Sequence, residues 1–315
     1  MSNIIKKIGK IFLPMPWQLI IADFIRIPKR LNYLQMDLER GLNDLQRLAG
    51  LILQQKYESM VTENQDPRLM INKSEFKIYS QNGEDGILLY IFSKIGTRNR
   101  RFVEFGCSNG RECNTANLSI NFGWHGFLMD CNKQNVTLAK QYYQNMLKTR
   151  SSDVKIIQCL VTVENINKAL LDNGFEGEID LLSIDIDGND YWVWKAITAI
   201  DPRVVVIEYN ASLGYEKSLT AKYDPNFNRF KEHPSGCYHG ASLAALTTLA
   251  KSKGYILVGC DSNGINAFFV RKDAAQGKLV ELSAQEAYFP NFRRLERLST
   301  SEQLECTKHL DFNYI

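Results

Sequence analysis

The stretch that decides the fold is Arg101-Phe-Val-Glu-Phe-Gly-Cys-Ser-Asn-Gly110. Its aromatic and β-branched residues favour a buried strand. Gly106 and Gly110 permit tight turning and close approach of a ligand before the next helix, and the acidic residue Glu104 stands just before the first glycine. The stretch therefore predicts a strand that runs directly into a ligand-binding loop.

A second acidic residue follows at the spacing of an adenosine-binding site. Residues 126–130 form the next predicted strand, and Asp130 at its end lies twenty residues beyond Gly110. A carboxylate there can accept hydrogen bonds from both hydroxyls of a ribose. A dinucleotide site would need Gly-x-Gly-x-x-Gly, whereas this loop has Ser108 in place of a middle glycine. We expect an adenosyl-type ligand, with a surface aspartate as the alternative.

The predicted sheet ends in a hairpin. Asn263-Gly264 separates two apolar runs, residues 254–260 and 266–270. Asn-Gly between apolar runs is a strong hairpin signal, because both residues tolerate positive φ. The pattern indicates an antiparallel hairpin at the edge of a mainly parallel sheet, a feature that the dinucleotide-binding Rossmann fold lacks.

Acidic and amide side chains gather where two further strands are predicted to end. One strand runs into Asp185 and Asp187, and the next, residues 204–210, ends with Glu208 and Asn210. Ligands of open α/β sheets bind beyond the carboxyl ends of the strands. Oxygen ligands suit magnesium or manganese, so Asp187, Glu208 and Asn210 are candidate metal ligands. The alternative is that Asp187 and Asp190 cap the next helix and Glu208 bonds to backbone.

A long stretch rich in aromatic residues, 212–238, follows the second of these strands. Loops of this length in compact domains are usually lids or binding loops. His233 lies within it and His239 directly after it, so both are candidate general bases, with a structural role as the alternative. Glu84 and Asp85, at the start of a predicted helix, have two interpretations as well: helix capping or ligand contact.

Composition excludes several classes of protein. The apolar fraction is 44% and the charged fraction 23%, which is ordinary for a globular protein. A net charge of +3 without a basic stripe argues against a nucleic-acid partner. The seven cysteines are scattered without Cys-x-x-Cys spacing, which favours reduced thiols and a cytoplasmic location over disulfides or a zinc site.

The amino-terminal region has its own character. Residues 4–28 mix apolar runs with lysines and prolines and are too interrupted for a spanning helix; they are interpreted as a membrane-surface element, a packing segment or a secretion signal. Within residues 31–55, apolar residues recur at spacings of three and four, as on one helical face. That face predicts docking on the chain's own domain or a coiled-coil homo-oligomer. Its members are Leu31, Leu34, Leu38, Leu42, Leu45, Leu48 and Ile52.

Residues 77–271 resemble the Rossmann-fold methyltransferases that use S-adenosylmethionine (SAM), and most of all their FkbM-type branch. Four segments carry the resemblance: Tyr79-Ser-Gln-Asn-Gly-Glu-Asp85, Val103-Glu-Phe-Gly106, Asp130 and Ile184-Asp-Ile-Asp-Gly-Asn-Asp190. The resemblance implies a seven-stranded α/β sheet with an antiparallel terminal hairpin, preceded by a helical segment. We therefore expect a helical segment at 1–74, a methyltransferase domain at 75–271 and a carboxyl-terminal extension at 272–315.

The resemblance also implies a site. Glu104 and Gly106 are expected near the methionine part of SAM and Asp130 on its ribose. The acids at 185–190 are similar to those of metal-dependent sugar O-methyltransferases, which hold magnesium at strand ends. Ser108 and Asn210 depart from the usual glycine and acid. The expected cofactor-binding residues are Gln81, Glu84, Asp85, Glu104, Gly106, Gly110, Asp130 and Asp185.

These features predict an O-methyltransferase that uses SAM, with or without Mg²⁺, to methylate a sugar hydroxyl of a glycan or glycolipid. His239 or His233 would act as the base, and the chain would be cytoplasmic, with the amino terminus as a candidate membrane contact. The alternative is a methyltransferase-fold scaffold without turnover that assembles through the leucine-rich helix. The sequence does not identify the acceptor.

Overall fold

A computed structural model describes residues 41–42, 44–58, 70–147 and 153–315. The chain divides into two compact units, residues 1–49 and 50–315. Of the first unit only a short helical part is described, so the predictions for residues 4–28 and for Leu31, Leu34 and Leu38 lie outside the described residues. Within the described part, no helix is long and apolar enough to cross a membrane.

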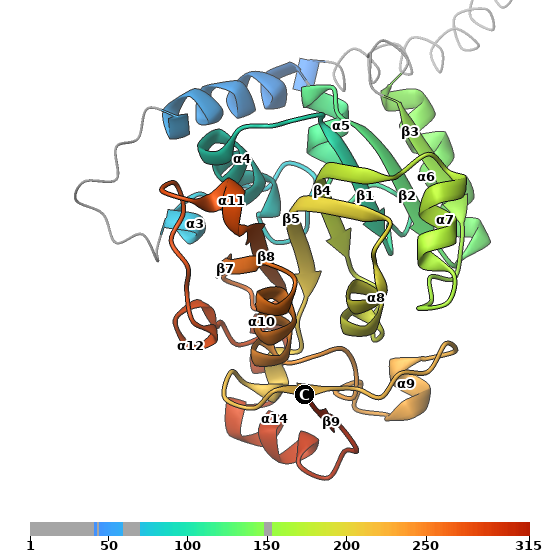
Figure 1. Ribbon diagram of the computed structural model, residues 1–315, viewed down its shortest axis with the longest axis vertical. Helices are drawn as coiled ribbons and strands as arrows, with labels where there is room; N and C mark the ends of the chain where they lie inside the picture. The colour runs from blue at the N-terminus through green and yellow to red at the C-terminus, as the bar shows by residue number, and fades with distance from the viewer. Residues whose placement is uncertain (1–40, 43, 59–69, 148–152) are drawn as a thin grey trace, which may run out of the picture. The chain divides into compact units, whose positions relative to one another are not determined.

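The second unit is built on a seven-stranded sheet with the order β3-β2-β1-β4-β5-β8-β7 (Figure 1). Strands β1 to β5 are parallel, whereas β8 is antiparallel to both β5 and β7. The predicted fold class and the Asn263-Gly264 hairpin are therefore confirmed. The strands are Arg101–Phe105 (β1), His125–Asp130 (β2), Val154–Gln158 (β3), Gly177–Ile184 (β4), Ile200–Glu208 (β5), Tyr255–Cys260 (β7) and Asn266–Arg271 (β8).

Helices cover both faces of the sheet, because alternate side chains of each central strand enter separate apolar cores. On β1, Phe102 packs on one face, and Val103 and Phe105 pack on the other. One face carries α4 (Glu84–Ile95), α5 (Ala116–Phe122) and α6 (Lys133–Met146). The other carries α7 (Ile166–Asp172), α8 (Asp190–Ala196) and α10 (Leu243–Ser252).

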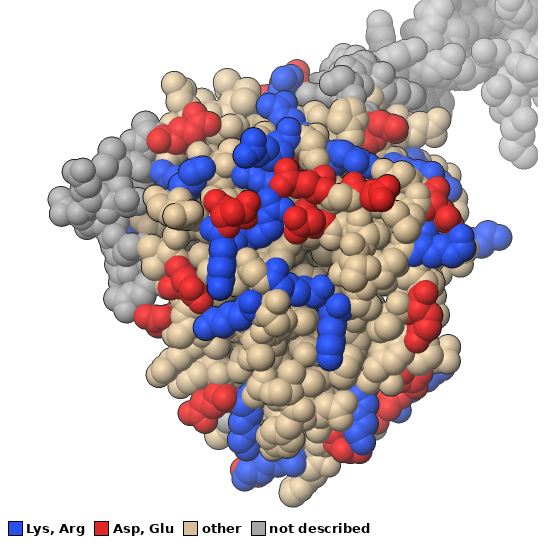
Figure 2. Space-filling view, viewed as in Figure 1, with Lys and Arg blue, Asp and Glu red and all other residues tan. Residues whose placement is uncertain are grey.

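The amino-terminal edge of the sheet is fixed by a buried ion pair. Asp180 accepts the backbone N–H groups of residues 98–100 and a 2.8 Å bond from Arg203 Nη1, and both side chains are at most 5% exposed. Nearby, Arg271 pairs with Glu178, Asp201 and Asp273. Figure 2 shows acidic side chains beside basic ones in the upper half of the view. These buried and surface charges are therefore paired within the protein, and the opposite edge carries the site.

Residues that precede the sheet in the chain already belong to its core. Tyr57, Met70 and Ile71 are each at most 5% exposed and pack with α4. Tyr57 Oη also donates to the carbonyl of Ser74, and α3 (Met70–Lys73) lies against β7. The compact body thus begins before residue 75, where the sequence predicted the methyltransferase domain to start.

The segment after the hairpin wraps around the stretch between β5 and α10. Its β9 (Asn313–Tyr314) pairs with β6 (Leu219–Thr220), and Phe312 packs on Tyr238. The carbonyls of Phe289 and Pro290 lie so close to Gly264 that a side chain there would strike them. Residues 272–315 therefore form an ordered cover. The remaining elements are η2 (Ala211–Leu213), α9 (Arg229–Glu232), α11 (Lys272–Ala275), α12 (Ala284–Ala287), α13 (Phe292–Leu295) and α14 (Thr300–Thr307).

Candidate active site

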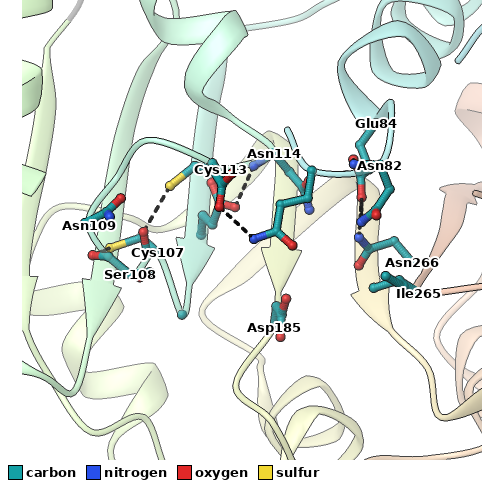
Figure 3. Close-up of a pocket in the computed structure, with 14 residues that line it drawn as sticks. Asn82, Glu84, Cys107, Ser108, Asn109, Cys113, Asn114, Asp185, Ile265 and Asn266 are labelled. Carbon is teal, nitrogen blue, oxygen red and sulfur yellow. Dashed lines mark hydrogen bonds between the residues drawn. The ribbon is translucent and has the colours of Figure 1, made fainter. Parts of the chain in front are cut away.

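A pocket lies where the chain order of the sheet reverses, beyond the carboxyl ends of β1 and β4 (Figure 3). This is the place where open α/β sheets bind their ligands. The loop before α4, the loop after β1, the residue after β4 and the start of β8 all contribute to it. The lining residues of this β1 pocket are Gln81, Asn82, Glu84, Glu104, Gly106, Cys107, Ser108, Asn109, Glu112, Cys113, Asn114, Asp185, Ile265 and Asn266.

The loop after β1 adopts a shape that glycine alone tolerates well at its first position. Gly106 has φ +76°, and a Cβ on it would lie 1.6 Å from the carbonyl oxygen of Asp185. Ser108 also has positive φ, +46°, a conformation that L-residues rarely adopt. This explains why a glycine is expected at 108: the backbone keeps the glycine-like conformation, and serine adopts it.

Glu104 holds this loop against the start of α5. It is 5% exposed and accepts bonds from the backbone N–H groups of Asn114 and Thr115, the hydroxyl of Thr115, and at 3.4 Å the hydroxyl of Ser183. Burial raises the pKa of Glu104, and these hydrogen bonds oppose the rise. Glu104 therefore lines the pocket, but its lone pairs are largely used within the protein.

Asp130 joins the end of β2 to the same loop. Its Oδ2 accepts the N–H of Ser108 at 2.8 Å and its Oδ1 accepts the N–H of Asn132 at 2.8 Å. It is 8% exposed and lies outside the pocket lining described above. Asn135 Nδ2 also lies 3.5 Å from Oδ1. The predicted acid at the end of β2 is thus directly connected to the loop of β1, and its Oδ2 is the oxygen with the freer lone pair.

Two other predicted cofactor-binding residues, Asp85 and Gly110, hold parts of the protein together and do not face the pocket. Asp85 accepts the backbone N–H groups of Ile78, Tyr79 and Ser80, and burial raises its pKa to about 6. Gly110, at φ +80°, packs against α6. Neither lines the pocket, whereas Gln81, Glu84, Glu104, Gly106 and Asp185 do.

The charge of the β1 pocket has one sign. Four carboxylates line it, those of Glu84, Glu104, Glu112 and Asp185, and none of its described lining residues is lysine, arginine or histidine. Such a lining attracts a cationic ligand and repels phosphate groups. It is therefore unsuited to the pyrophosphate of a dinucleotide, in agreement with the missing Gly-x-Gly-x-x-Gly.

Three carboxylates converge beside the pocket, at the ends of β4 and β5. Oxygens of Asp185, Asp187 and Glu208 lie within 4.8 Å of one another. Burial among protein atoms raises the pKa values of Asp185 and Glu208, and the neighbouring aspartates raise them further, although Asp185 keeps a solvent-accessible side in the crevice. Glu208 Oε2 is buried without a hydrogen-bond partner. These three carboxylates lie near two arginines, Arg229 of α9 and Arg294 of α13, whose contacts are given below. We call the five residues together the strand-end cluster.

Arg229 of α9 brings a positive charge to these acids. Its Nη1 lies 2.7 Å from Asp187 Oδ1, and its Nε and Nη2 donate to the carbonyl of Gly236. Asp187 itself has φ +60°, an uncommon conformation for a residue with a side chain. The next aspartate, Asp190, accepts the N–H groups of Ile186 and Gly188 and so fixes the loop before α8, whose N-cap residue Asn189 makes no side-chain cap bond.

Asn210 and His239 form a buried network with Arg294 of the carboxyl-terminal cover. Arg294 Nη1 donates to Asn210 Oδ1 at 2.9 Å and to Ser212 Oγ at 2.7 Å, and its Nη2 lies 3.2 Å from His239 Nε2. Asn210 Oδ1 also accepts the N–H of Ser212. The candidate metal ligands Asp187 and Glu208 are thus brought together with Asp185, while the oxygen of Asn210 is used elsewhere.

The two histidines differ in environment. His239 is 1% exposed, and burial together with the charges of Arg229 and Arg294 lowers its pKa well below the usual value. It is therefore neutral, with Nε2 directed at Arg294 and 3.8 Å from Glu208 Oε1. His233 ends α9 and interacts with Ser235. Of the two, only His239 contacts the strand-end cluster.

Sequence reasoning missed the residues that reach the site from distant segments. Asn82 and Asn114 lie next to predicted residues, but asparagine in a loop is a weak signal on its own. Asn266, Arg229 and Arg294 come from β8, α9 and α13. The sequence did contain one hint of Asn266: it begins a strand directly after a hairpin turn. The start of that strand pairs with the carboxyl end of β5, where the site lies.

Residues 65–256 match the family model described as methyltransferase FkbM domain, which covers about three-fifths of the chain. No curated protein matches the sequence. Arg294 and the rest of the carboxyl-terminal cover lie beyond the matched residues.

Solved structures with a similar fold were also found. Magnesium protoporphyrin IX methyltransferase from Synechocystis PCC 6803 with bound SAM is 10% identical, with 67% of this chain and 100% of that chain covered and a TM-score of 0.39. The amino-terminal domain of EvdMO1 with bound S-adenosylhomocysteine is 13% identical, with 67% and 98% covered and a TM-score of 0.38. The family assignment rests on the family model and not on these distant likenesses.

Proposed function

Because this chain belongs to the FkbM methyltransferase family, we propose that it transfers the methyl group of SAM to a sugar hydroxyl of a glycan or glycolipid. The observation that carries the proposal is the β1 pocket, lined by four carboxylates and, among its described lining residues, by no basic side chain. SAM presents a sulfonium and an ammonium group, which this charge favours.

The donor's position follows from the loop geometry. We propose that Asp130, which is tied to the N–H of Ser108, accepts the ribose hydroxyls with its remaining lone pairs. Gly106 lets the backbone approach the donor closely, and Asp185 lies where the pocket meets the strand-end cluster. The methyl group would then face the ends of β4 and β5.

The reaction needs positioning more than covalent help from the protein. The acceptor oxygen attacks the methyl carbon in line, the carbon–sulfur bond breaks, S-adenosylhomocysteine leaves and the hydroxyl proton is released. Holding the two substrates in line supplies much of the acceleration. Polar groups of the strand-end cluster suit an acceptor rich in hydroxyls, because carboxylates accept hydrogen bonds from them.

A divalent cation fits the same cluster. Asp185, Asp187 and Glu208 provide three oxygens within 4.8 Å of one another, and Glu208 Oε2 lacks a partner. A bound Mg²⁺ would act as a Lewis acid toward the acceptor hydroxyl. His239 is a neutral neighbour whose Nε2 is directed at Arg294, so His239 can take a proton only if Arg294 moves away. We keep His239 and His233 as candidate bases.

The test is transfer of labelled methyl groups from SAM to a cell extract, which is then separated into glycan, lipid, protein and small-molecule fractions. We expect label in an oligosaccharide or glycolipid fraction. Label in protein or small metabolites alone would contradict the sugar acceptor while leaving the methyltransferase assignment intact. Retention of full activity after exhaustive chelation would remove the metal, and retention of activity in both His239→Gln and His233→Gln would remove the histidines as bases.

A second proposal concerns assembly. Leu42, Leu45, Leu48 and Ile52 are 54–66% exposed, which is unusual for four leucine-like side chains at helical spacing. We propose that they mediate homo-oligomerisation, the property on which the scaffold alternative depends. Sedimentation of a Leu45→Glu/Leu48→Glu variant tests it: we expect loss of association with SAM binding retained. An unchanged sedimentation coefficient would contradict it.

A further inference from the structure

One corner of the β1 pocket joins segments that are far apart in the sequence. Glu84, the first residue of α4, accepts bonds at Oε1 from Asn82 Nδ2 at 2.9 Å and from Asn266 Nδ2 at 2.8 Å. Its Oε2 accepts the N–H of Asn82 at 2.7 Å. Figure 3 shows Asn82 and Asn266 around the Glu84 carboxylate at one end of the pocket. The carboxylate is therefore fixed in place by both sides.

Asn266 has one polar atom without a partner. Its side chain is 3% exposed, its Nδ2 donates to Glu84, and its Oδ1 is buried and accepts no hydrogen bond within the described structure. Buried acceptors in folded proteins are nearly always paired. Because Asn266 lines the pocket, the donor that completes it can come from a bound molecule.

The orientation of the corner indicates which part of a bound molecule it meets. Ser108, which is tied to Asp130, lies at the opposite end of the pocket in Figure 3, and Asp185 lies between the two ends. With the ribose at Asp130 and the sulfonium near Asp185, the amino-acid end of the donor extends toward Glu84 and Asn266. That end carries an ammonium group with three N–H donors.

Glu104 is the obvious competitor for this ammonium group. Its oxygens already accept two backbone N–H groups and the Thr115 hydroxyl, which fix the loop after β1. The corner at Glu84 instead combines a fixed carboxylate with an unpaired amide oxygen. Asp261 lies behind this corner and holds Asn266 in place, since it accepts the N–H of Asn266.

We propose that Asn266 Oδ1 and Glu84 bind the α-ammonium group of the methyl donor, so that the hairpin strand β8 is part of the donor site. The inference rests on the proposed function and identifies the group that recognises the amino-acid end. It also gives the antiparallel hairpin a binding role in addition to closing the sheet.

The first test uses the wild-type full chain and two probes, S-adenosylhomocysteine and its analogue without the amino group, in calorimetric titrations. We expect the deaminated analogue to bind at least tenfold more weakly. Equal affinities would overturn this inference and leave the proposed function standing. Binding of neither probe by folded protein would overturn both.

The second test compares two variants that each remove one hydrogen bond to Glu84. Asn266→Ala also removes the unpaired oxygen, whereas Asn82→Ala leaves it in place. We expect Asn266→Ala to weaken S-adenosylhomocysteine at least tenfold and the deaminated analogue less than twofold, and Asn82→Ala to have a smaller selective effect. Equal losses for the two probes in Asn266→Ala would overturn the inference. Thermal melting identifies a variant that fails to fold. In that case the inference is decided by the first test, which compares the two probes on the wild-type chain.

Discussion

The β1 pocket and the strand-end cluster lie at the same edge of the sheet but differ in charge balance. Among the described lining residues, the pocket has four carboxylates and no basic group, whereas Arg229 and Arg294 lie among the acids of the cluster. The pocket also lies largely within the residues that match the family, while Arg294 lies beyond them. The acids of the cluster and Arg229 lie within the matched residues as well, so charge balance is what distinguishes the pocket, our proposed donor half, from the cluster, our proposed acceptor half.

Closing the donor half should have the largest effect. Gly106→Ala puts a Cβ against the Asp185 carbonyl, so we expect at least a hundredfold loss of affinity for SAM. Gly174→Ala is the matched control, because Gly174 has a similar φ of +80° with nothing within 4 Å of the added atom. Calorimetry compares the two. Similar affinities in both variants would show that the loop does not approach the donor.

A substitution in the proposed acceptor half should lower catalysis without changing the binding of SAM. Arg294→Met leaves Asn210, Ser212 and His239 without their shared donor, and we expect kcat/KM for the acceptor to fall at least tenfold while SAM affinity changes less than twofold. Arg293→Met, an exposed neighbour, is the control. A parallel fall in SAM affinity would mean that the two regions are not independent.

A buried acid next to the proposed donor half, Asp261, should change how the free energy of unfolding depends on pH. Burial, and then the charge of Glu84, raises the pKa of Asp261 to about 8. A raised pKa means that the folded state holds the proton more tightly, so stability falls as pH rises toward 8. Between pH 6.5 and 7.5 the wild-type free energy of unfolding should fall by about 1 kcal/mol more than that of Asp261→Asn. Urea titrations at a series of pH values measure the free energy of unfolding of both proteins. Parallel pH dependence in the wild type and Asp261→Asn would contradict this prediction.

Removing the positive charge of Arg229 should have the smallest effect, a modest rise in the affinity of the cluster for Mg²⁺. Arg229→Met frees Asp187, and we expect affinity of the cluster for Mg²⁺ to rise about threefold because a competing positive charge is lost. Lys231→Met on the same helix, which is exposed, is the control. Calorimetric titrations of both variants and the wild type with Mg²⁺ give the affinities. Unchanged or weaker binding in Arg229→Met would show that Arg229 does not compete with a metal.

The sequence predicted the strands and turns around the proposed donor half well because their signals are local. Glu104, Gly106 and Asp130 occupy two neighbouring strand ends, and the Asn263-Gly264 hairpin depends on turn chemistry within a few residues. Asp85 and Gly110 were harder, because a residue that shapes a loop and one that binds through it have the same pattern. Their hydrogen bonds and packing, seen only in the fold, distinguish the two roles.

The residues that complete the two regions from distant segments, Arg294 in the cluster and Asn266 in the pocket, escaped prediction because they depend on pairings across long separations. Arg294 meets Asn210 across 84 residues, and Asn266 meets Glu84 across 182. No periodicity or spacing connects such positions before the sheet order is known. Asn210 illustrates the consequence: its place after β5 suggested a metal ligand, but Arg294 and Ser212 occupy its oxygen.

The central claim is that the β1 pocket selects a cationic adenosyl donor. Its most direct test is calorimetric titration of the folded full chain with SAM and, separately, with NAD⁺. We predict saturable binding of one SAM per chain and no binding of NAD⁺, because the carboxylate lining repels its pyrophosphate. Binding of NAD⁺, or failure of folded protein to bind SAM, would contradict the claim.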